Sequence, residues 1–457
     1  MINEMKPRSK IWYIFCVAGI VATFFLVYTI VTPYESYQIQ SDLKLPPTTT
    51  TNIQLDEEHP IKVGVLHSLS GTMAISERPV ADATLLAIEE INERGGILGR
   101  KVEPILVDGK SDWQTFAHEA ERLITEEKVS AVFGGWTSAS RKTMKPVFEE
   151  YNHLLFYPVQ YEGLEESPNI IYTGAAPNQQ AIPAIDWAFK NLGTKFFLVG
   201  SDYVFPRSAN AIMTERIKEL GGVVVGEEYK VLGSKDFSDT VKKIKEAKSD
   251  VILNTINGDS NIWFFRELRE SGITPKHIPT ISFSIAESEI QQFEASDMAG
   301  DYAAWNYFQS LDIPENEIFV ENFKTRYGQD RVTSDPMEAA YIGIYIFAKA
   351  AEKSGSDDVN KIREAVKGIT LVAPEGIVGV DPQTQHLAKT VRIGKILNNG
   401  QFEVVASSEA GIMPVPYPSY KSKQEWDTFL NNLYVGWDKN WANLKSSDLI
   451  VIEGQNG

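Results

Sequence analysis

Residues 134–184 read GGWTSASRKTMKPVFEEYNHLLFYPVQYEGLEESPNIIYTGAAPNQQAIPA, and this stretch decides the fold. It contains two short apolar runs, at 154–158 and 169–174, with the length and composition of buried strands. A loop rich in hydroxyl and aromatic side chains precedes the first run, and a second such loop follows it. We expect the two loops to form one wall of a cleft for a small molecule, and the chain near residue 180 to cross between two lobes.

The chain upstream of this stretch alternates predicted strands and helices. Strands are expected at 61–66, 101–107 and 130–135. A helix beginning at Pro79 separates the first two strands, and an amphipathic helix around Phe116 separates the second and third. Strand–helix–strand units of this kind form a parallel sheet with right-handed crossovers.

The same alternation continues downstream. We predict helices at 181–191, 206–220, 238–248 and 261–271, and strands at 196–200, 222–229, 251–255, 279–284 and 299–308. Three later helices (315–327, 336–353 and 358–367) precede a hairpin of strands 391–396 and 401–407, which the sequence Asn-Asn-Gly turns. The fold class is therefore α/β with two Rossmann-like lobes, and residues 413–457 are predicted to form a tail packed on the surface.

An apolar segment precedes the lobes. Residues 1–10 form a basic stub, and residues 11–32 carry no charge. As a helix this run would span roughly 33 Å, enough to cross a bilayer, and the basic flank predicts a cytoplasmic N-terminus. The run is long and lacks an A-x-A-like cleavage site, so we predict a transmembrane signal anchor, with a cleaved signal peptide as the alternative. Residues 33–59 have the composition of a linker, and the lobes are predicted to lie in the periplasm or another extracytoplasmic space.

Composition narrows the function. The net charge of −17 excludes nucleic acid as an electrostatic partner. The six His residues do not occur at metal-ligand spacing, and the sequence contains no HExxH, CxxC, GxGxxG, G-x-S-x-G or P-loop motif. We therefore expect no metal, no cofactor and no enzymatic activity.

The predicted strand ends locate a candidate site, because ligands of open parallel sheets bind beyond the carboxyl ends of the strands. The loops at these ends carry mainly Ser, Thr, Asn and aromatic residues, which is typical of a site for a small, polar, neutral molecule. These loops are 67–72, 134–140, 157–163, 201–207, 254–260 and 282–288.

Each loop residue also has a purely structural interpretation. Ser138 or Ser140 would serve as a helix N-cap, and Trp136 would belong to the core. Tyr203 and Phe205 would staple a helix that begins at Pro206, and the Asn-Gly pair at 257–258 would only make a turn.

Several segments resemble one family. GGWTSASRK, YPVQYEGLEESPNIIYTGAAPNQQ and GSDYVFPR are similar to the urea-binding proteins of urea ABC transporters, within the type I periplasmic binding proteins. Amide-sensing regulators and short-chain-amide binders are relatives of that group. SLSGTMA, DGKSDWQTFA, TISFSIAE and YKSKQEWDTFLNNLYVGW match as well, so the resemblance covers about 60–440 and leaves out the N-terminal segment.

The resemblance implies two lobes joined by three crossings, near residues 180, 308 and 377. The first lobe would comprise 60–180 and 309–376, and the second 181–308 and 377–412. The lobes would close over the ligand by a hinge motion.

The resemblance also implies a set of ligand-binding residues. Val159 departs from the family pattern, which has Thr at this position in the amide sensors, and Gln160 or Tyr161 would replace the missing hydroxyl. The full predicted set is Trp136, Thr137, Ser138, Tyr157, Gln160, Tyr161, Tyr203, Phe205, Asn257 and Gly258.

The implied function is capture of urea and its delivery to the permease subunits of an ABC transporter. Short-chain amides and branched-chain or neutral amino acids are the alternatives, because Asp202, Glu162 and Asp259 lie in the loops and a carboxylate could pair with an α-ammonium group. A membrane-tethered ligand sensor is a third possibility.

Overall fold

The computed structural model describes residues 55–444. The predicted stub at 1–10 and the predicted membrane segment at 11–32 lie outside the described residues. Among the residues that are described, none of the helices is both long and apolar enough to span a bilayer. The first strand begins at Asp56, inside the linker predicted to end at 59, and the Asp56 amide donates to the Gly99 carbonyl at 2.9 Å.

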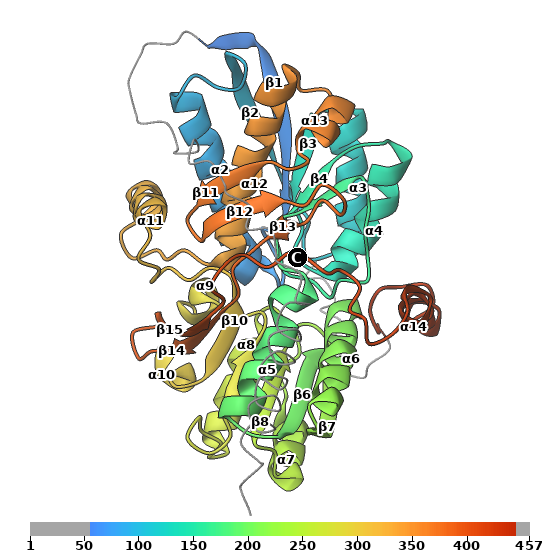
Figure 1. The fold of residues 1–457 in the computed structure, drawn as a ribbon, viewed down its shortest axis with the longest axis vertical. Helices are drawn as coiled ribbons and strands as arrows, with labels where there is room; N and C mark the ends of the chain where they lie inside the picture. Colours follow the sequence, from blue (N-terminus) through green and yellow to red (C-terminus); the bar gives the residue numbers. More distant parts are fainter. Residues whose placement is uncertain (1–54, 445–457) are drawn as a thin grey trace, which may run out of the picture. The chain divides into compact units, whose positions relative to one another are not determined.

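The first sheet contains five parallel strands in the order β2-β1-β3-β4-β5 (Figure 1). Helices connect the first four strands along the chain, in line with the alternation that the sequence predicts for this part, and residues 158–169 connect β4 to β5 without a helix. These elements are β1 (Asp56–His67), α2 (Ala74–Glu93), β2 (Arg100–Asp108), α3 (Trp113–Thr125), β3 (Ala131–Gly134), α4 (Ser138–Glu150), β4 (Leu155–Tyr157) and β5 (Ile170–Tyr172).

The second sheet has the order β15-β14-β10-β9-β8-β6-β7. Strands β6 to β10 pair in parallel, whereas β14 pairs antiparallel with both β10 and β15. The elements are α5 (Ala181–Asn191), β6 (Lys195–Ser201), α6 (Val204–Glu219), β7 (Val223–Lys230), α7 (Ser238–Ala247), β8 (Val251–Thr255), α8 (Ser260–Glu270), β9 (Thr280–Ser282), α9 (Glu287–Ile290), α10 (Ala295–Met298), β10 (Tyr302–Trp305), β14 (Arg392–Ile396) and β15 (Phe402–Ser407).

The central strands of the second sheet are buried on both faces, because successive side chains of a strand point to opposite faces and both sets are buried here. Phe196 and Leu198 of β6 belong to one apolar cluster, and Phe197 and Val199 belong to the other. A strand without a polar face, such as β6, can lie only in the interior of a sheet that helices cover on both sides.

Late parts of the chain return to the first sheet. Helix α12 (Asp335–Ser354) packs against α2, β3 and β4, with α11 (Pro314–Tyr327) and α13 (Val359–Ala365) beside it in the chain. Pro336 in the first turn of α12 and Gly355 at φ 64° after its end are the usual helix start and stop residues. A small sheet of β11 (Thr370–Ala373), β12 (Gly376–Val380) and β13 (Leu387–Ala388) follows, and residue 377 lies within it. The lobe boundaries stay predictions.

One helix prediction was wrong in detail because proline was weighted too strongly as a helix start. Helix α2 begins at Ala74 and contains Pro79, although the sequence analysis places its start at that residue. Helix α4 likewise contains a proline, Pro146, and runs through it without a break.

The tail contains a helix that the sequence analysis does not predict, α14 (Lys423–Gly436). Ser422 and Glu425 form a capping box at its start. Trp426 of this helix is fully buried in the apolar cluster that also contains residues of β6 and α6, and its indole donates to the Pro418 carbonyl at 2.9 Å. Part of the tail is therefore integral to the core beneath the second sheet.

Candidate functional site

The predicted ligand residues meet where loops from the two sheets face each other, and every one of them is buried. The indole N–H of Trp136, after β3, donates to Oδ1 of Asn257, after β8, at 3.1 Å. The Asn257 side-chain N–H donates to the Thr255 carbonyl at 3.1 Å, and the Asn257 amide donates to Ser201 Oγ at 3.0 Å. These bonds orient the Asn257 carboxamide so that its oxygen faces Trp136.

Gln160 makes a second connection between the sheets. Its Nε2 donates to the Phe283 carbonyl at 2.6 Å and lies 3.3 Å from Ser284 Oγ, both after β9. Its Oε1 is buried and has no hydrogen-bond donor within the described residues. A buried acceptor without a donor is costly, by about 1–3 kcal/mol. Gln160 therefore offers an acceptor to a ligand that carries N–H groups.

Gly258 allows the third connection. Its φ is 68°, and a Cβ at this position would lie 2.9 Å from the Thr72 carbonyl oxygen, so a side chain would collide with the first-sheet loop. Beside it the Thr72 hydroxyl donates to the Asp259 carboxylate, and the Asp259 amide donates to the Thr72 carbonyl at 3.4 Å. The Asn-Gly pair is a turn, and it also brings the two loops into contact.

Thr137 and Tyr157 organise the Trp136 loop. The N-cap of α4 is Thr137, whose hydroxyl accepts from the Ser140 amide at 3.0 Å. The interpretation of Ser138 or Ser140 as the N-cap was therefore wrong by one and three positions, respectively. The Tyr157 hydroxyl donates to the Trp136 carbonyl. Thr137 and Tyr157, both predicted as ligand residues, therefore use their hydroxyl groups to stabilise the conformation of the Trp136 loop.

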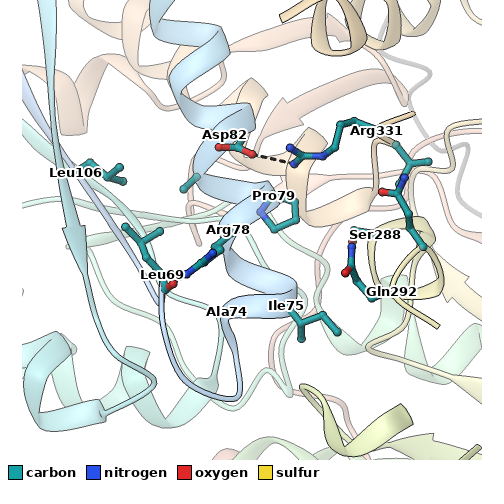
Figure 2. A pocket seen from close by; sticks show the side chains of 13 residues that line it. Leu69, Ala74, Ile75, Arg78, Pro79, Asp82, Leu106, Ser288, Gln292 and Arg331 are labelled. Carbon is teal, nitrogen blue, oxygen red and sulfur yellow. Dashed lines mark hydrogen bonds and ion pairs between the residues drawn. The ribbon is translucent and has the colours of Figure 1, made fainter. Parts of the chain in front are cut away.

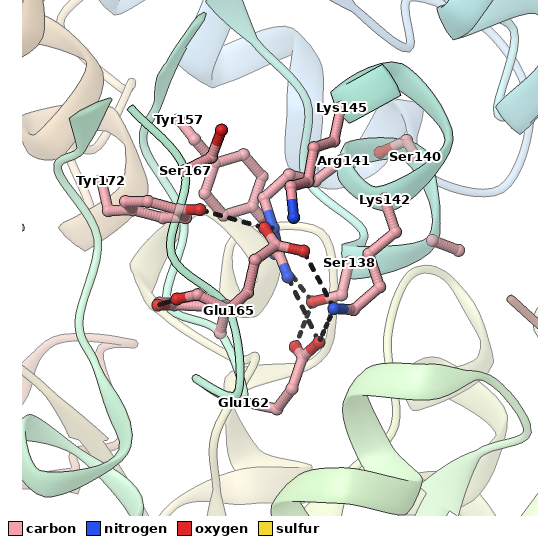
Figure 3. A network of polar contacts seen from close by, with 12 residues as sticks. Ser138, Ser140, Arg141, Lys142, Lys145, Tyr157, Glu162, Glu165, Ser167 and Tyr172 are labelled. Atoms are coloured by element: carbon pink, nitrogen blue, oxygen red, sulfur yellow. Dashed lines mark hydrogen bonds and ion pairs between the residues drawn. The ribbon is translucent and has the colours of Figure 1, made fainter. Parts of the chain in front are cut away.

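Ser138 belongs to a buried charge cluster (Figure 3). Its hydroxyl donates to Glu162, and Arg141 Nη1 donates to Ser138 Oγ at 3.0 Å. Arg141 also pairs with Glu165 at 2.8 Å and Glu162 at 3.2 Å, and Lys142 pairs with Glu165 at 2.9 Å. Burial alone would lower the pKa of Arg141, but Glu165 and Glu162 outweigh it and raise this pKa above its ordinary value.

The same cluster holds Glu165 ionised. Burial would raise the pKa of this carboxyl, yet Arg141 and Lys142 hold it well below its usual range. The cluster is therefore internally neutralised, and the Ser138 hydroxyl is engaged by a carboxylate rather than directed at an open space.

Tyr161 points into the protein on the first-sheet side. Its ring stacks on Tyr172 at 5.0 Å, and its hydroxyl contacts the Glu165 carbonyl at 3.1 Å and His386 Nε2. Tyr203 and Phe205 approach from the second sheet, with ring centroids 6.3 Å apart. Burial raises the pKa of Tyr203, and the nearby Tyr157 and Glu162 raise it further.

The space left between these groups is small. One enclosed cavity of about 10 Å³ lies against Tyr161, Glu162, Gln180, Phe205 and Phe283. This volume holds about one water molecule. The loops are thus packed against each other, and a ligand larger than water requires the lobes to separate and to close again around it.

Glu77 is a buried carboxylate at this junction that was not among the predicted site residues. It is 1% exposed, accepts from the Ser68 amide at 2.8 Å and lies 3.4 Å from His67 Nδ1. The prediction placed the helix start at Pro79, and so Glu77 was assigned to no element. The SLSGT loop that precedes it was the signal that could have identified this site.

A larger groove borders the strand-end loops, with Leu69 and Ser288 of those loops in its lining (Figure 2). It has a volume of about 910 Å³, and an ion pair of 2.8 Å joins Asp82 and Arg331 across its wall. None of the predicted ligand residues contributes to the lining that the structure describes, which consists of Leu69, Ala74, Ile75, Arg78, Pro79, Ala81, Asp82, Leu106, Ser288, Gln291, Gln292, Arg331 and Val332. Within residues 55–444 no group of three His, Cys, Asp or Glu side chains is placed to hold a metal ion.

Comparison with known proteins gives related sequences. Residues 61–423 match the model of the periplasmic binding protein domain family. The Leu/Ile/Val-binding protein homolog 6 of Brucella melitensis biotype 1 is 24% identical over 343 residues, 74% of this chain and 87% of that protein. A protein named limonene hydroxylase from Geobacillus stearothermophilus is 42% identical over 118 residues, but this chain spans only 21% of its length.

Solved structures share the fold. A solute-binding protein of an ABC transporter from Rhodopseudomonas palustris HaA2, in complex with p-hydroxybenzoic acid, has a TM-score of 0.70 and 24% identity, covering 78% of this chain and 98% of that chain. A leucine-binding protein from Thermotoga maritima MSB8 has a TM-score of 0.68 and 23% identity, covering 76% and 98%. The α/β architecture with two lobes, and the match over most of the described residues, place this chain in the periplasmic binding protein domain family.

Proposed function

We propose that this protein is the extracytoplasmic solute-binding component of an ABC transporter and that its solute is urea. The family supports a role in solute binding outside the cytoplasm. The observation that carries the finer proposal is the contact between Trp136 and Asn257, a hydrogen-bond donor and an acceptor that follow strands of the two different sheets and face each other. Membrane attachment through residues 11–32 and delivery to permease subunits belong to the same proposal.

The chemistry of urea matches this pair. Urea has one acceptor oxygen and four N–H donors, so it can accept from the Trp136 indole and donate to Asn257 Oδ1 at the same time. The unpaired Gln160 Oε1 is a further acceptor for an amino group. An N-methylated analogue would leave one of these groups unpaired, at a cost of about 1–3 kcal/mol.

Charge at the junction argues against anionic solutes. Arg141 and Lys142, the cations of the Ser138 cluster, are already paired with Glu162 and Glu165. A carboxylate ligand at this point would have to break those pairs or rely on backbone N–H groups. A neutral molecule requires neither.

A neutral or branched-chain amino acid is the second candidate. It is favoured by the Glu77 and Asp259 carboxylates beside the junction, either of which could pair with an α-ammonium group. The relative from Brucella melitensis is also named as a Leu/Ile/Val-binding protein homolog. Short-chain amides need the same donors and acceptors as urea, plus room for a methyl group.

Isothermal titration calorimetry on the purified full chain in detergent tests the proposal. Urea, acetamide, leucine and 4-hydroxybenzoate are titrated in turn, and we expect urea to bind most tightly. Asn257→Leu should weaken urea binding by at least tenfold, whereas Asn431→Leu on the exposed side of α14 should leave it unchanged. Binding of leucine without binding of urea would transfer the assignment to the amino-acid candidate.

A further inference from the structure

The chain after α14 returns to the candidate site. Residue Ala442 forms an antiparallel bridge with Tyr203, and the Val204 amide donates to the Trp441 carbonyl at 2.9 Å. The Asn443 amide donates to the Asp202 carbonyl at 3.0 Å, and its side chain donates to Asp202 Oδ2 at 2.8 Å. Three consecutive tail residues therefore pair with three consecutive residues of the loop between β6 and α6.

This loop needs an external partner. Tyr203 is the N-cap of α6, and its side chain makes no capping hydrogen bond. The first amides of a helix have no partner within the helix. The carbonyl of Trp441 satisfies one of them, that of Val204, so the tail supplies a cap that the local sequence lacks. The loop that is held in this way carries Tyr203, and the first turn of α6 carries Phe205.

The tail also contacts the other half of the site. The Lys142 ammonium lies 5.2 Å from the centroid of the Trp441 ring, within the range of a cation–π interaction. Lys142 pairs with Glu165 and lies 3.7 Å from Glu162, which accepts from the Ser138 hydroxyl. Trp441 is thus linked through side chains to the first-sheet loop and through its backbone to the second-sheet loop.

We propose that residues 441–443 are positioning residues of the ligand site. They hold Tyr203 and Phe205 in the conformation that receives the solute, and through Lys142 they connect this loop to the Ser138 loop when the lobes are closed. The inference rests on the proposed function, because it assigns the effect to solute capture between these loops. It adds a tail segment that touches no solute itself.

Two truncated forms of the full-length protein provide a matched pair. A chain ending at residue 439 loses the bridge, whereas a chain ending at 444 keeps it. We expect the shorter chain to bind urea at least tenfold more weakly in titration calorimetry and to release it faster, and the longer one to behave as the full chain. Equal affinity in all three would overturn the inference.

A point variant covers the case in which the shorter chain does not fold. Asn443→Ala removes the side-chain contact with Asp202 and should weaken binding about threefold or more. Asn431→Ala, on the exposed face of α14, should have no effect. Equal affinities of these two variants would contradict a positioning role for Asn443.

Hydrogen exchange separates this inference from the choice of solute. The Val204 amide should exchange at least tenfold faster in the chain ending at 439 than in the chain ending at 444, with no ligand present. If the full chain binds none of the four solutes, the proposed function fails. Unchanged exchange at Val204 overturns the positioning role independently of any ligand.

Discussion

Glu287 should make the stability of this protein fall as the pH rises. It lies at the start of α9 and is 1% exposed, its Oε1 accepts from the Gln309 amide at 2.7 Å, and its Oε2 has no donor among the described residues. The pKa of Glu287 is raised from 4.5 to about 8, mainly by burial; the hydrogen bond from the Gln309 amide opposes this shift, and the nearby Asp335 and Glu289 carboxyls add to it.

The sign follows from proton binding. Between pH 4.5 and about 8 the folded state keeps the proton on Glu287 while the unfolded state has lost it, so the free energy of unfolding decreases over this window. Below pH 4.5 both states are protonated, and the contribution is fully present. At about 1.4 kcal/mol per pKa unit, the shift corresponds to a loss of roughly 5 kcal/mol by the time the pH exceeds 8.

Glu287→Gln should remove this dependence, because the amide is neutral at every pH and its oxygen can still accept from the Gln309 amide. The variant should match the wild type near pH 4 and exceed it by several kcal/mol at pH 9. Guanidinium chloride unfolding followed by tryptophan fluorescence measures the difference; urea is unsuitable as denaturant because it is the proposed ligand.

The exposed Glu294→Gln serves as the control and should change stability by no more than about 0.5 kcal/mol at either pH. A free energy of unfolding that Glu287→Gln lowers by the same amount at pH 4 and at pH 9, relative to the wild type, would refute the reasoning. It would mean that the carboxyl contributes through its contacts and not through its bound proton.

Three further outcomes are expected. Trp136→Ala should reduce urea affinity at least tenfold in titration calorimetry, and an unchanged affinity would return this residue to a purely structural role. Gly134→Ala should prevent accumulation of folded protein, measured by circular dichroism, because its Cβ would lie 1.9 Å from the Leu66 carbonyl oxygen; a normal spectrum would contradict this. Mass spectrometry of the mature protein should find an N-terminus near Met1 if residues 11–32 are an anchor, and a start near residue 33 would indicate cleavage.

The alternation of strands and helices could be predicted well because it depends on local apolar patterns. The antiparallel hairpin of β14 and β15 is confirmed, with Gly400 at φ 77° in its turn. Helix α14 was missed although Ser422 and Glu425 carry a capping-box signal, because its surroundings are rich in Tyr and Pro. Whether Trp426 of this helix is buried depends on distant elements, which no local pattern reveals.

The site was predictable only as a set of loops. Strand ends identify which loops converge, and this placed Trp136 and Asn257 in one set. That their side chains bond to each other depends on how the two sheets face, which a sequence pattern does not contain. Ser138 illustrates the limit, since its hydroxyl is directed by Glu162 and Arg141, residues whose charges suggest exposure although the structure buries them completely.

Each sheet is completed by elements from late in the sequence, and this order affects when the chain can fold during its synthesis. The first sheet lacks its covering helix α12 until residue 354 has been synthesised, and β10 lacks its partner β14 until residue 396. Contacts between such distant parts of a chain slow folding. A chain in which neither lobe can fold until late stays unfolded for most of its synthesis. A translocation channel accepts polypeptides in this unfolded state. The interleaved topology thus favours folding after passage, on the side of the membrane where the solute is captured.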